Sequence, residues 1–401
     1  TQASSSAASD VYKRQVIPYG RQQITNSDIS EVKKVLKSDF LTQGPTVTKF
    51  EKTVTDYCNV KYAVAVNSAT SALHIACLAL ELGPGDILWT TPNTFVASAN
   101  CARYCGAKVD FVDINPVTYN ISIDNLIRKL EIAKKKGNLP KILIPVHFAG
   151  QPSEMSKIYK LAKLYKFKII EDASHAIGAK YKKSIIGSCE YSDVTVFSFH
   201  PVKIITTGEG GMAVTNDKKI IDKMRRLHIH GITNDKSKMK RRPKSEIWNY
   251  QQIDLGFNYR MNDIQAALGI SQIRRIDKYV QKRNKIAKIY DLELANLPIK
   301  LPTNLPDVYS SYHLYQVRVK QTKKYNQKKI YNYLRKKGIA ANLHYTPVHR
   351  HPYYENLGFK RFDFPEAERF HKEVISIPIF PSLKKEEQFY VINTLMKAFK
   401  K

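Results

Sequence analysis

The chain has few acidic residues: 35 Asp and Glu stand against 65 Lys and Arg, so the formal net charge is +30 over 401 residues. A surplus this large is typical of proteins that bind nucleic acid or an anionic membrane surface. The lysines are spread along the whole chain, however, and the densest basic run, residues 236–244, contains no aromatic residue. Helix-turn-helix, zinc-finger and single-strand stacking signatures are also absent. We therefore expect no nucleic-acid partner and interpret the charge as solvated surface that attracts anionic small molecules.

Cysteine is scarce as well, with five residues, an odd number, and no Cys-x-x-Cys pair. Cys101 and Cys105 stand one helical turn apart, but no histidine or further cysteine nearby completes a zinc-binding set, so we expect no metal site. The pattern favours reduced cysteines in the core of a cytoplasmic protein. Long apolar runs are missing too. None approaches the roughly 20 residues that a membrane span needs, and we expect no membrane partner.

Gly/Ser-rich linkers and internal repeats are absent, so composition and pattern must divide the chain. Its length suits about two or three domains. Residues 1–15 are small and polar without an apolar pattern, and we expect a disordered leader or a non-native remnant there. In an N-terminal segment at 16–50, Ser27 or Asp28 can cap a helix. We expect a large domain at 51–269 and a small C-terminal domain at 270–401.

Seven short apolar runs predict buried strands. They lie at residues 62–66, 87–91, 108–112, 141–147, 167–171, 194–199 and 211–215. Helical patterns lie between them, clearest at 155–165, which predicts a doubly wound, mostly parallel α/β sheet. In the C-terminal part, strand candidates at 312–319 and 339–345 flank a helix at 326–337, as in a smaller α/β domain.

A single lysine, Lys203, stands between the run at 194–199 and a glycine cluster at 208–211, just after Pro201. This spacing places it on a turn and not on a helix face. A partly desolvated amine can lose its proton near neutral pH and attack a carbonyl to form a Schiff base. Taken alone, the commoner explanation is a loop lysine that points to water. A chemical role for Lys203 therefore depends on what lies beside it.

Upstream, Glu171 and Asp172 come at the C-terminal end of a buried strand, where open α/β sheets place their ligands. A carboxylate there can keep the nitrogen of a pyridine ring protonated, so that the ring draws electrons from a bound substrate. The alternative for Asp172 alone is a helix N-cap.

Residues 67–72, Asn-Ser-Ala-Thr-Ser-Ala, lie between a predicted strand and a predicted helix. Small hydroxyl residues at such a turn present free amide groups and the positive end of the helix, which suits a phosphate. An ordinary Ser/Thr cap is the alternative. Phe95, at the start of another helix, could lie flat on a cofactor ring, and its alternative is a place in the core.

Three sets of residues, at 171–176, at 197–203 with 208–211, and at 255–269, resemble the motifs of DegT/StrS-type sugar-nucleotide aminotransferases. The resemblance extends from roughly residue 16 to the C-terminus. It implies the aspartate-aminotransferase fold (PLP fold type I), pyridoxal 5'-phosphate as cofactor, and a homodimer with shared active sites. It also implies amino transfer from L-glutamate to a keto sugar nucleotide. The expected acceptor is C4 of the UDP-linked 4-keto-6-deoxy sugar of pseudaminic acid biosynthesis.

The resemblance assigns roles to single residues. Lys203 holds the cofactor and then moves the proton of the amino donor, while Asp172 pairs with the ring nitrogen. The further cofactor contacts that it implies are Ala69, Thr70 and Ser198 at the phosphate, Phe95 on the ring, His175 near the phenolic oxygen, and Asn258 from the neighbouring subunit. The substrate contacts that it implies are Tyr19, Thr42, Gln43, His344 and Tyr345. For His175, a purely structural role is the alternative.

Three other functions stay open at this level. Some relatives have histidine in place of the lysine and dehydrate the sugar, so Lys203 favours amino transfer. The acceptor could instead be another 3- or 4-keto sugar linked to dTDP, GDP or UDP. The remaining alternative is a basic regulator that binds nucleic acid on an inactive version of the fold. Loss of Lys203 or Asp172 would have supported it, and both are present.

Overall fold

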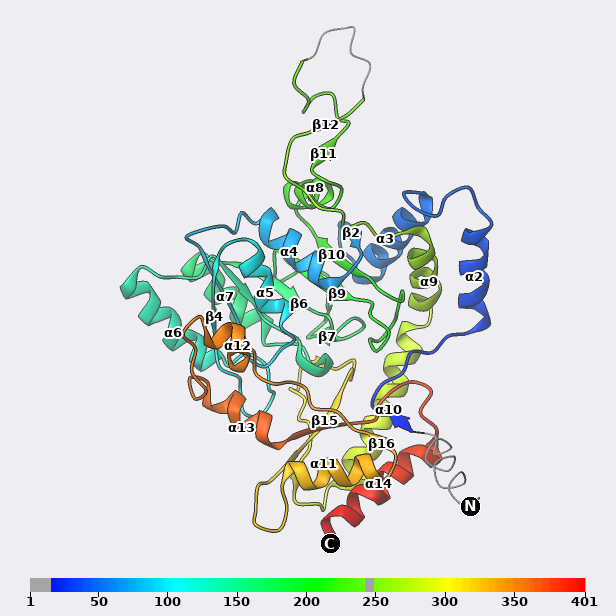
Figure 1. Ribbon diagram of the computed structural model, residues 1–401, viewed down its shortest axis with the longest axis vertical. Coiled ribbons are helices and arrows are strands. Elements are labelled where there is room, and N and C mark those ends of the chain that lie inside the picture. The colour runs from blue at the N-terminus through cyan, green and yellow to red at the C-terminus, as the bar shows by residue number, and fades with distance from the viewer. Residues whose placement is uncertain (1–15, 242–248, 401) are drawn as a thin grey trace, which may run out of the picture.

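The computed structural model describes residues 16–241 and 249–400, with a seven-stranded sheet at its centre (Figure 1). The order across this sheet is β2-β10-β9-β6-β5-β3-β4. β10 runs antiparallel to both of its neighbours, and the other pairs are parallel. The predicted strands and the mostly parallel α/β sheet are thus confirmed. Their bounds are β2 (Tyr62–Val66), β3 (Ile87–Thr90), β4 (Lys108–Phe111), β5 (Ile142–Ile144), β6 (Lys168–Asp172), β9 (Val194–Ser198) and β10 (Gly211–Thr215).

Helices cover both faces of the sheet, and the two-residue repeat of the strands decides which side chains meet which face. In β2, Ala63 and Ala65 join one core cluster, whereas Val64 and Val66 join the other. The first cluster is completed by α3 (Pro45–Cys58), α6 (Ile123–Lys136), α7 (Met155–Tyr165) and α9 (Asp263–Ile273). The second is completed by α4 (Ala69–Ala79), α5 (Ala97–Tyr104) and α8 (Lys218–Leu227). With both faces covered, a ligand can reach this sheet at the strand ends.

The C-terminal part of the chain has an apolar core of its own, formed by a small sheet and three helices. The sheet order is β13-β15-β17, with antiparallel pairs. The elements are β13 (Ile299–Lys300), β15 (Tyr315–Val319), β17 (Val374–Ile377), α10 (Ile276–Leu294), α11 (Gln327–Lys336) and α14 (Lys385–Lys400). Between β16 (Ile339–Ala340) and β17 the chain returns to the large sheet through α12 (Pro352–Glu355) and α13 (Pro365–Glu373), where Tyr354 and Phe370 join the α4 and α5 cluster. The two cores are therefore linked by packing as well as by the chain.

The prediction of a strand over 339–345 is wrong for most of its length. Only β16 (Ile339–Ala340) is a strand, and it pairs in parallel with β1 (Ile17–Pro18). Asn342 then bonds through its backbone to Ser376, which turns the chain away from β1. The next residues run toward the large sheet, and the segment carries its side chains to a cavity there.

The predicted cap of the first helix is also wrong. The N-cap of α2 (Asn26–Leu36) is Thr25, whose backbone N–H donates to Asp28 Oδ2 at 2.8 Å. Asp28 is buried, and it also accepts a hydrogen bond from Arg275 at 2.6 Å. Asp28 therefore closes a capping box and anchors α2 near the end of α9, so it acts inside the helix and not at its start.

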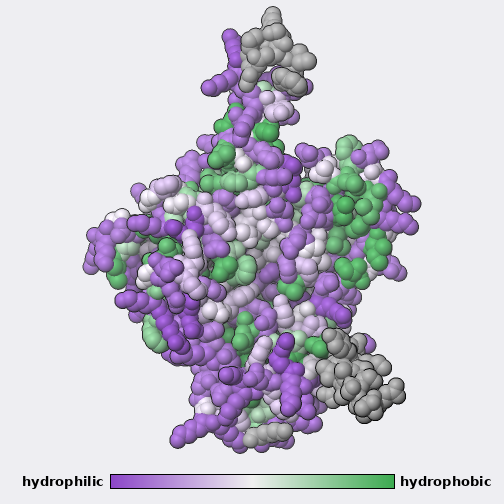
Figure 2. Space-filling model, in the orientation of Figure 1, coloured by the Kyte–Doolittle hydropathy of each residue, from purple (hydrophilic) through white to green (hydrophobic). Residues whose placement is uncertain are grey.

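Two surface features lie away from the sheet ends. β11 (Ile232–Thr233) and β12 (Gln251–Gln252) pair in an arm that projects beyond α8 (Figure 1). Figure 2 shows apolar side chains gathered over α2, where Ile29, Leu36 and Phe40 are 58%, 57% and 53% exposed. A further small sheet, in the order β14-β7-β8, consists of β14 (Val308–Tyr309), β7 (Lys180–Tyr181) and β8 (Ser184–Ile185).

The five cysteines are all buried and carry free thiols. Among the helices that the structure describes, none has the length and apolar character needed to cross a bilayer.

Candidate active site

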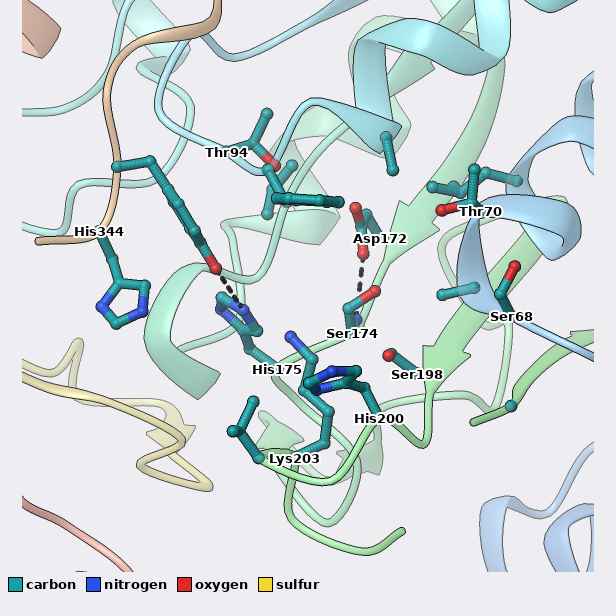
Figure 3. Close-up of a pocket in the computed structure, with 18 of the residues that line it drawn as sticks. Ser68, Thr70, Thr94, Asp172, Ser174, His175, Ser198, His200, Lys203 and His344 are labelled. Atoms are coloured by element: carbon teal, nitrogen blue, oxygen red, sulfur yellow. Dashed lines mark hydrogen bonds between the residues drawn. The ribbon is translucent and has the colours of Figure 1, made fainter. Parts of the chain in front are cut away.

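A cavity of about 340 Å³ opens at the carboxyl ends of β6 and β9, beside the N-terminus of α4 (Figure 3). The large sheet supplies part of its wall, and the segment after β16 closes another part. The structure brings together most of the residues that the sequence singled out. Those lining the cavity are Tyr19, Ala69, Thr70, Phe95, Asp172, His175, Ser198, Lys203, His344 and Tyr345.

Lys203 lies on a tight turn after β9, half-buried in the cavity wall. Its backbone N–H donates to the carbonyl of His200 at 2.9 Å, and Thr207 N–H closes the wider loop on the carbonyl of Phe199 at 3.0 Å. Burial lowers the pKa of Lys203 to about 8, and the nearby negative charge of Asp172 opposes this shift. Part of the amine is then uncharged near neutral pH. The lysine is available for attack on a carbonyl and does not point into bulk water.

Asp172 is the last residue of β6, and its carboxylate is 5% exposed. Oδ1 accepts a hydrogen bond from the Ser174 N–H at 3.1 Å, and Oδ2 accepts one from the Ser98 hydroxyl at 2.6 Å. The residues that follow form turns and not a helix, so the N-cap alternative does not hold. The arrangement fixes the carboxylate in the wall of the same cavity that Lys203 lines (Figure 3).

The N-terminus of α4 forms another part of the wall. Ser68 is the N-cap, and its hydroxyl oxygen accepts from the Ser71 N–H at 3.1 Å. The backbone N–H groups of Ala69 and Thr70 lie in the first turn of the helix and have no acceptor within it, so they can bind an anion. A Cβ on Gly211 would come within 2.4 Å of the Ala69 nitrogen, which shows how closely β10 passes this turn. The hydroxyl of Ser198 lies on the same side of the cavity (Figure 3).

His175 has both ring nitrogens satisfied. Nδ1 accepts from the Ala149 N–H at 3.2 Å, so Nε2 carries the proton and donates to the Tyr345 hydroxyl oxygen at 3.1 Å. Burial, with smaller contributions from Lys203 and His344, holds the pKa of His175 well below its usual value. Burial lowers the pKa of His344 to about 3. Both rings are therefore uncharged near neutral pH, and His175 is a neutral group on the cavity wall.

Phe95 is 59% exposed, which excludes the alternative of a core phenylalanine. Its ring lies at the cavity and is 6.4 Å from the ring of Tyr345, centroid to centroid. A flat apolar face at this position leaves room for a second ring against it.

Three predicted residues lie outside the cavity of their own chain. Thr42 and Gln43 are exposed on the loop before α3, whose end Asp263 holds through the Gly44 N–H at 2.9 Å. Asn258 is exposed beside the start of α4, where its carbonyl accepts from Asn67 Nδ2 at 3.4 Å. An exposed Asn258 is free to reach a neighbouring subunit, as the resemblance implies. The roles of all three stay predictions.

The sequence did not single out several residues that shape the cavity. His200 and Glu209 line it and belong to the motif around Lys203, so the same signal could have found them. His313 packs against His175 with the ring centroids 4.3 Å apart and the ring planes tilted by 40°. Ser98 contacts Asp172 from 74 residues away, and no local pattern points to that contact.

The chemistry of this set fits pyridoxal phosphate. An amine of lowered pKa suits its aldehyde, a fixed carboxylate suits its ring nitrogen, and free amides at a helix N-terminus suit its phosphate. The aromatic face of Phe95 suits the ring itself. All four lie in one cavity.

Comparison with known proteins gives a consistent result. Residues 22–396 match the DegT/DnrJ/EryC1/StrS aminotransferase family. A UDP-4-amino-4,6-dideoxy-N-acetyl-β-L-altrosamine transaminase from Campylobacter jejuni is 36% identical, over 96% of this chain and 98% of that protein. Helicobacter pylori PseC, an aminotransferase involved in the biosynthesis of pseudoaminic acid, has a TM-score of 0.87 at 31% identity, over 96% of this chain and 99% of that one. A Streptococcus pneumoniae protein described as a sugar aminotransferase, in its PLP form, has a TM-score of 0.85 at 30% identity, over 96% and 99%.

Proposed function

We propose an acceptor and a donor for this chain from one premise: it belongs to the DegT/DnrJ/EryC1/StrS aminotransferase family and is a pyridoxal-phosphate-dependent sugar aminotransferase. The proposed acceptor is C4 of UDP-4-keto-6-deoxy-N-acetyl-β-L-altrosamine, on the way to pseudaminic acid, and the proposed donor is L-glutamate. The nearly full-length similarity to the Campylobacter transaminase and to Helicobacter PseC supports this choice. The observation that carries the reaction type is Lys203 and Asp172 in one cavity.

The roles of the residues follow from their positions. When bound, pyridoxal phosphate supplies an electron sink for the electron pair left on the donor Cα. The amine of Lys203, uncharged in part at neutral pH, would move the proton of the donor Cα to the former aldehyde carbon of the cofactor, and would move a proton from that carbon to C4 of the sugar in the second half of the reaction. Asp172 holds the ring nitrogen, and the amides of Ala69 and Thr70 with the Ser198 hydroxyl bind the phosphate. Phe95 covers one face of the ring and limits the access of water.

A second copy of the chain is part of the proposal. Among the described residues that line the cavity, Lys203 is the one lysine or arginine, and Asp172 and Glu209 are acidic. A cofactor phosphate, a donor dicarboxylate and a nucleotide diphosphate all add negative charge, so further cations must come from elsewhere. A homodimer in which Asn258 and the basic residues near it reach the partner's cavity would supply them. The exposed apolar side chains over α2 (Figure 2) offer a surface for such an association.

The proposed location is the cytoplasm. Its support is the set of five buried free thiols, which suits a reducing compartment.

The test is spectroscopic. The purified chain is mixed with pyridoxal phosphate, and the absorption band of the lysine-bound cofactor is followed on addition of L-glutamate and then of the UDP keto sugar. We expect glutamate to bleach the band and the sugar to restore it. A dTDP-linked 4-keto-6-deoxy sugar serves as the matched acceptor. If that compound restores the band and the UDP sugar does not, the proposed acceptor is wrong while the reaction type stands.

A further inference from the structure

Two buried hydroxyl groups lead to Asp172: that of Thr94, which lines the cavity, and that of Ser98, which lies behind it. The Ser98 Oγ lies 2.6 Å from Asp172 Oδ2, and the Thr94 Oγ1 lies 2.8 Å from Ser98 Oγ. Ser98 is completely buried in the first turn of α5, and Thr94 is 3% exposed just before that helix. A deeply buried polar group keeps its place only if it is hydrogen-bonded, and here each hydroxyl finds its partner in the next.

The direction of these hydrogen bonds can be assigned. A carboxylate only accepts, so the single proton of Ser98 goes to Asp172. Its contact with the Phe95 carbonyl, at 3.4 Å, is much longer. Ser98 Oγ is then an acceptor for Thr94, which must donate. The chain of donors runs from Thr94 through Ser98 to Asp172, and it ends on a charge, which makes it stronger than a neutral pair.

The hydrogen bonds from Thr94 through Ser98 reach Asp172 from a different direction than the hydrogen bond from the Ser174 N–H. Oδ1 is held by the Ser174 N–H in the turn after β6, whereas Oδ2 is held from α5. Two donors on the two oxygens leave the carboxylate little freedom to rotate. Phe95 lies between Thr94 and Ser98 in the sequence and lines the cavity. One short segment thus presents the stacking ring and orients the acid.

We propose that the Thr94 and Ser98 hydroxyls are positioning groups that hold the Asp172 carboxylate aimed at the ring nitrogen of the cofactor. Through Asp172 they favour a bound ligand that carries this nitrogen. This inference rests on the proposed role of Asp172. It predicts that loss of either hydroxyl weakens what Asp172 recognises and leaves the phosphate and aldehyde contacts unchanged.

The experiment compares two probes on the cofactor-free protein: pyridoxal 5'-phosphate, and its analogue with carbon in place of the ring nitrogen. Both keep the aldehyde for Lys203 and the phosphate for α4, so those contributions cancel in the ratio of the two affinities. We expect Ser98→Ala to weaken pyridoxal phosphate binding about tenfold and binding of the carbon analogue less than about twofold. Thr94→Val should act in the same direction by about threefold, and Thr94→Ser, which keeps the hydroxyl, should behave as wild type.

Each outcome decides the matter. Equal weakening of both probes would mean that the hydroxyls only support the fold, and it overturns the proposal. So does a Ser98→Ala protein with unchanged affinity for pyridoxal phosphate. If Ser98→Ala does not fold, as thermal melting will tell, the Thr94 pair gives the same comparison at a less buried position. Asp172→Asn tests the role of Asp172 separately: it should weaken binding of pyridoxal phosphate much more than binding of the carbon analogue, and if it weakens both equally, the role of Asp172 itself is wrong.

Discussion

Glu171 and Asp172 are adjacent carboxylates of β6, 4% and 5% exposed, and they face opposite sides of the sheet. Glu171 accepts hydrogen bonds from His147 Nε2 at 2.7 Å, Ser192 Oγ at 2.5 Å and Thr195 Oγ1 at 3.0 Å. Asp172 lines the cavity and keeps acceptor capacity free for a ligand. Because successive side chains of a strand point to opposite faces, Glu171 lies in the protein interior and Asp172 lines the cavity.

The environments of the two acids differ accordingly. Burial alone would raise the pKa of Glu171, but its hydrogen bonds with His147, Ser192 and Thr195 outweigh burial and leave that pKa lowered. Because Ser153 N–H donates to His147 Nδ1 at 3.1 Å, the ring must donate from Nε2. Glu171 is thus a charged group whose partners are all provided by the protein. A buried carboxylate becomes useful to a ligand only when its partners are left incomplete, as at Asp172.

The largest effect is expected from removal of the Lys203 amine, which lines the cavity beside Asp172. Lys203→Ala should abolish transamination, because no other lysine within residues 16–241 and 249–400 lines the cavity to hold the cofactor or to move the proton. A matched control is Lys168→Ala at the opposite end of β6, where the side chain is 54% exposed and pairs with Asp193. The control should keep activity within about twofold. Substantial turnover by Lys203→Ala in a glutamate-dependent assay would contradict the site.

The next largest effect separates the two acids directly. Asp172→Asn should lower the rate about 100-fold or more, since a charge that stabilises the transition state is lost. Its melting temperature should fall less than that of Glu171→Gln, because the amide oxygen can keep the Ser174 N–H and the Ser98 hydroxyl can donate instead to the Phe95 carbonyl. Comparable activity of Asp172→Asn and wild type would contradict the assignment of Asp172, and not Glu171, as the acid that acts on the cofactor.

Glu171→Gln should show the opposite pattern. The amide group would place its N–H atoms against the donor of His147 or the hydroxyls of Ser192 and Thr195, so at least one donor loses its acceptor. We expect a loss of about 1–3 kcal/mol in the free energy of unfolding. Turnover per folded molecule should stay near that of wild type. Chemical denaturation combined with an activity assay measures both quantities, and a large loss of turnover without destabilisation would contradict the assignment.

The smallest expected effect is a shift in the pH profile of cofactor binding by Lys203. Lys203 attacks as a free amine, so the rate of cofactor capture should rise about tenfold per unit below its pKa of about 8 and level off above it. The charge of Asp172 raises this pKa, so Asp172→Asn should move the midpoint to lower pH. Glu171→Gln should leave the midpoint in place, because Glu171 lies on the other face. Stopped-flow absorbance on the cofactor-free protein gives all three profiles.

Much of the fold and of the cavity could be predicted because the signals are local. The seven strands follow from short apolar runs, and the phosphate turn and the lysine turn each lie within a few residues of a strand end. The contacts made by Ser98 and His313 could not be predicted, since each joins elements far apart in the sequence. The cap at Thr25 was missed because the buried pairing of Asp28 with Arg275 is a tertiary contact. The segment after Ala340 was misjudged because Ala341 and Leu343 pack with the C-terminal core without forming a strand, while His344 and Tyr345 line the cavity.

The pairing of β1 with β16 has a consequence for protein synthesis. Tyr19 lines the cavity directly after β1, its ring is 5.0 Å from that of His344, and its carbonyl accepts from the Ile379 N–H at 3.0 Å. The first strand therefore has no partner until residues 339–340 have left the ribosome. A nascent chain that has completed the seven-stranded sheet still has an open cavity. The complete cofactor cavity thus forms late in synthesis or after release of the chain from the ribosome.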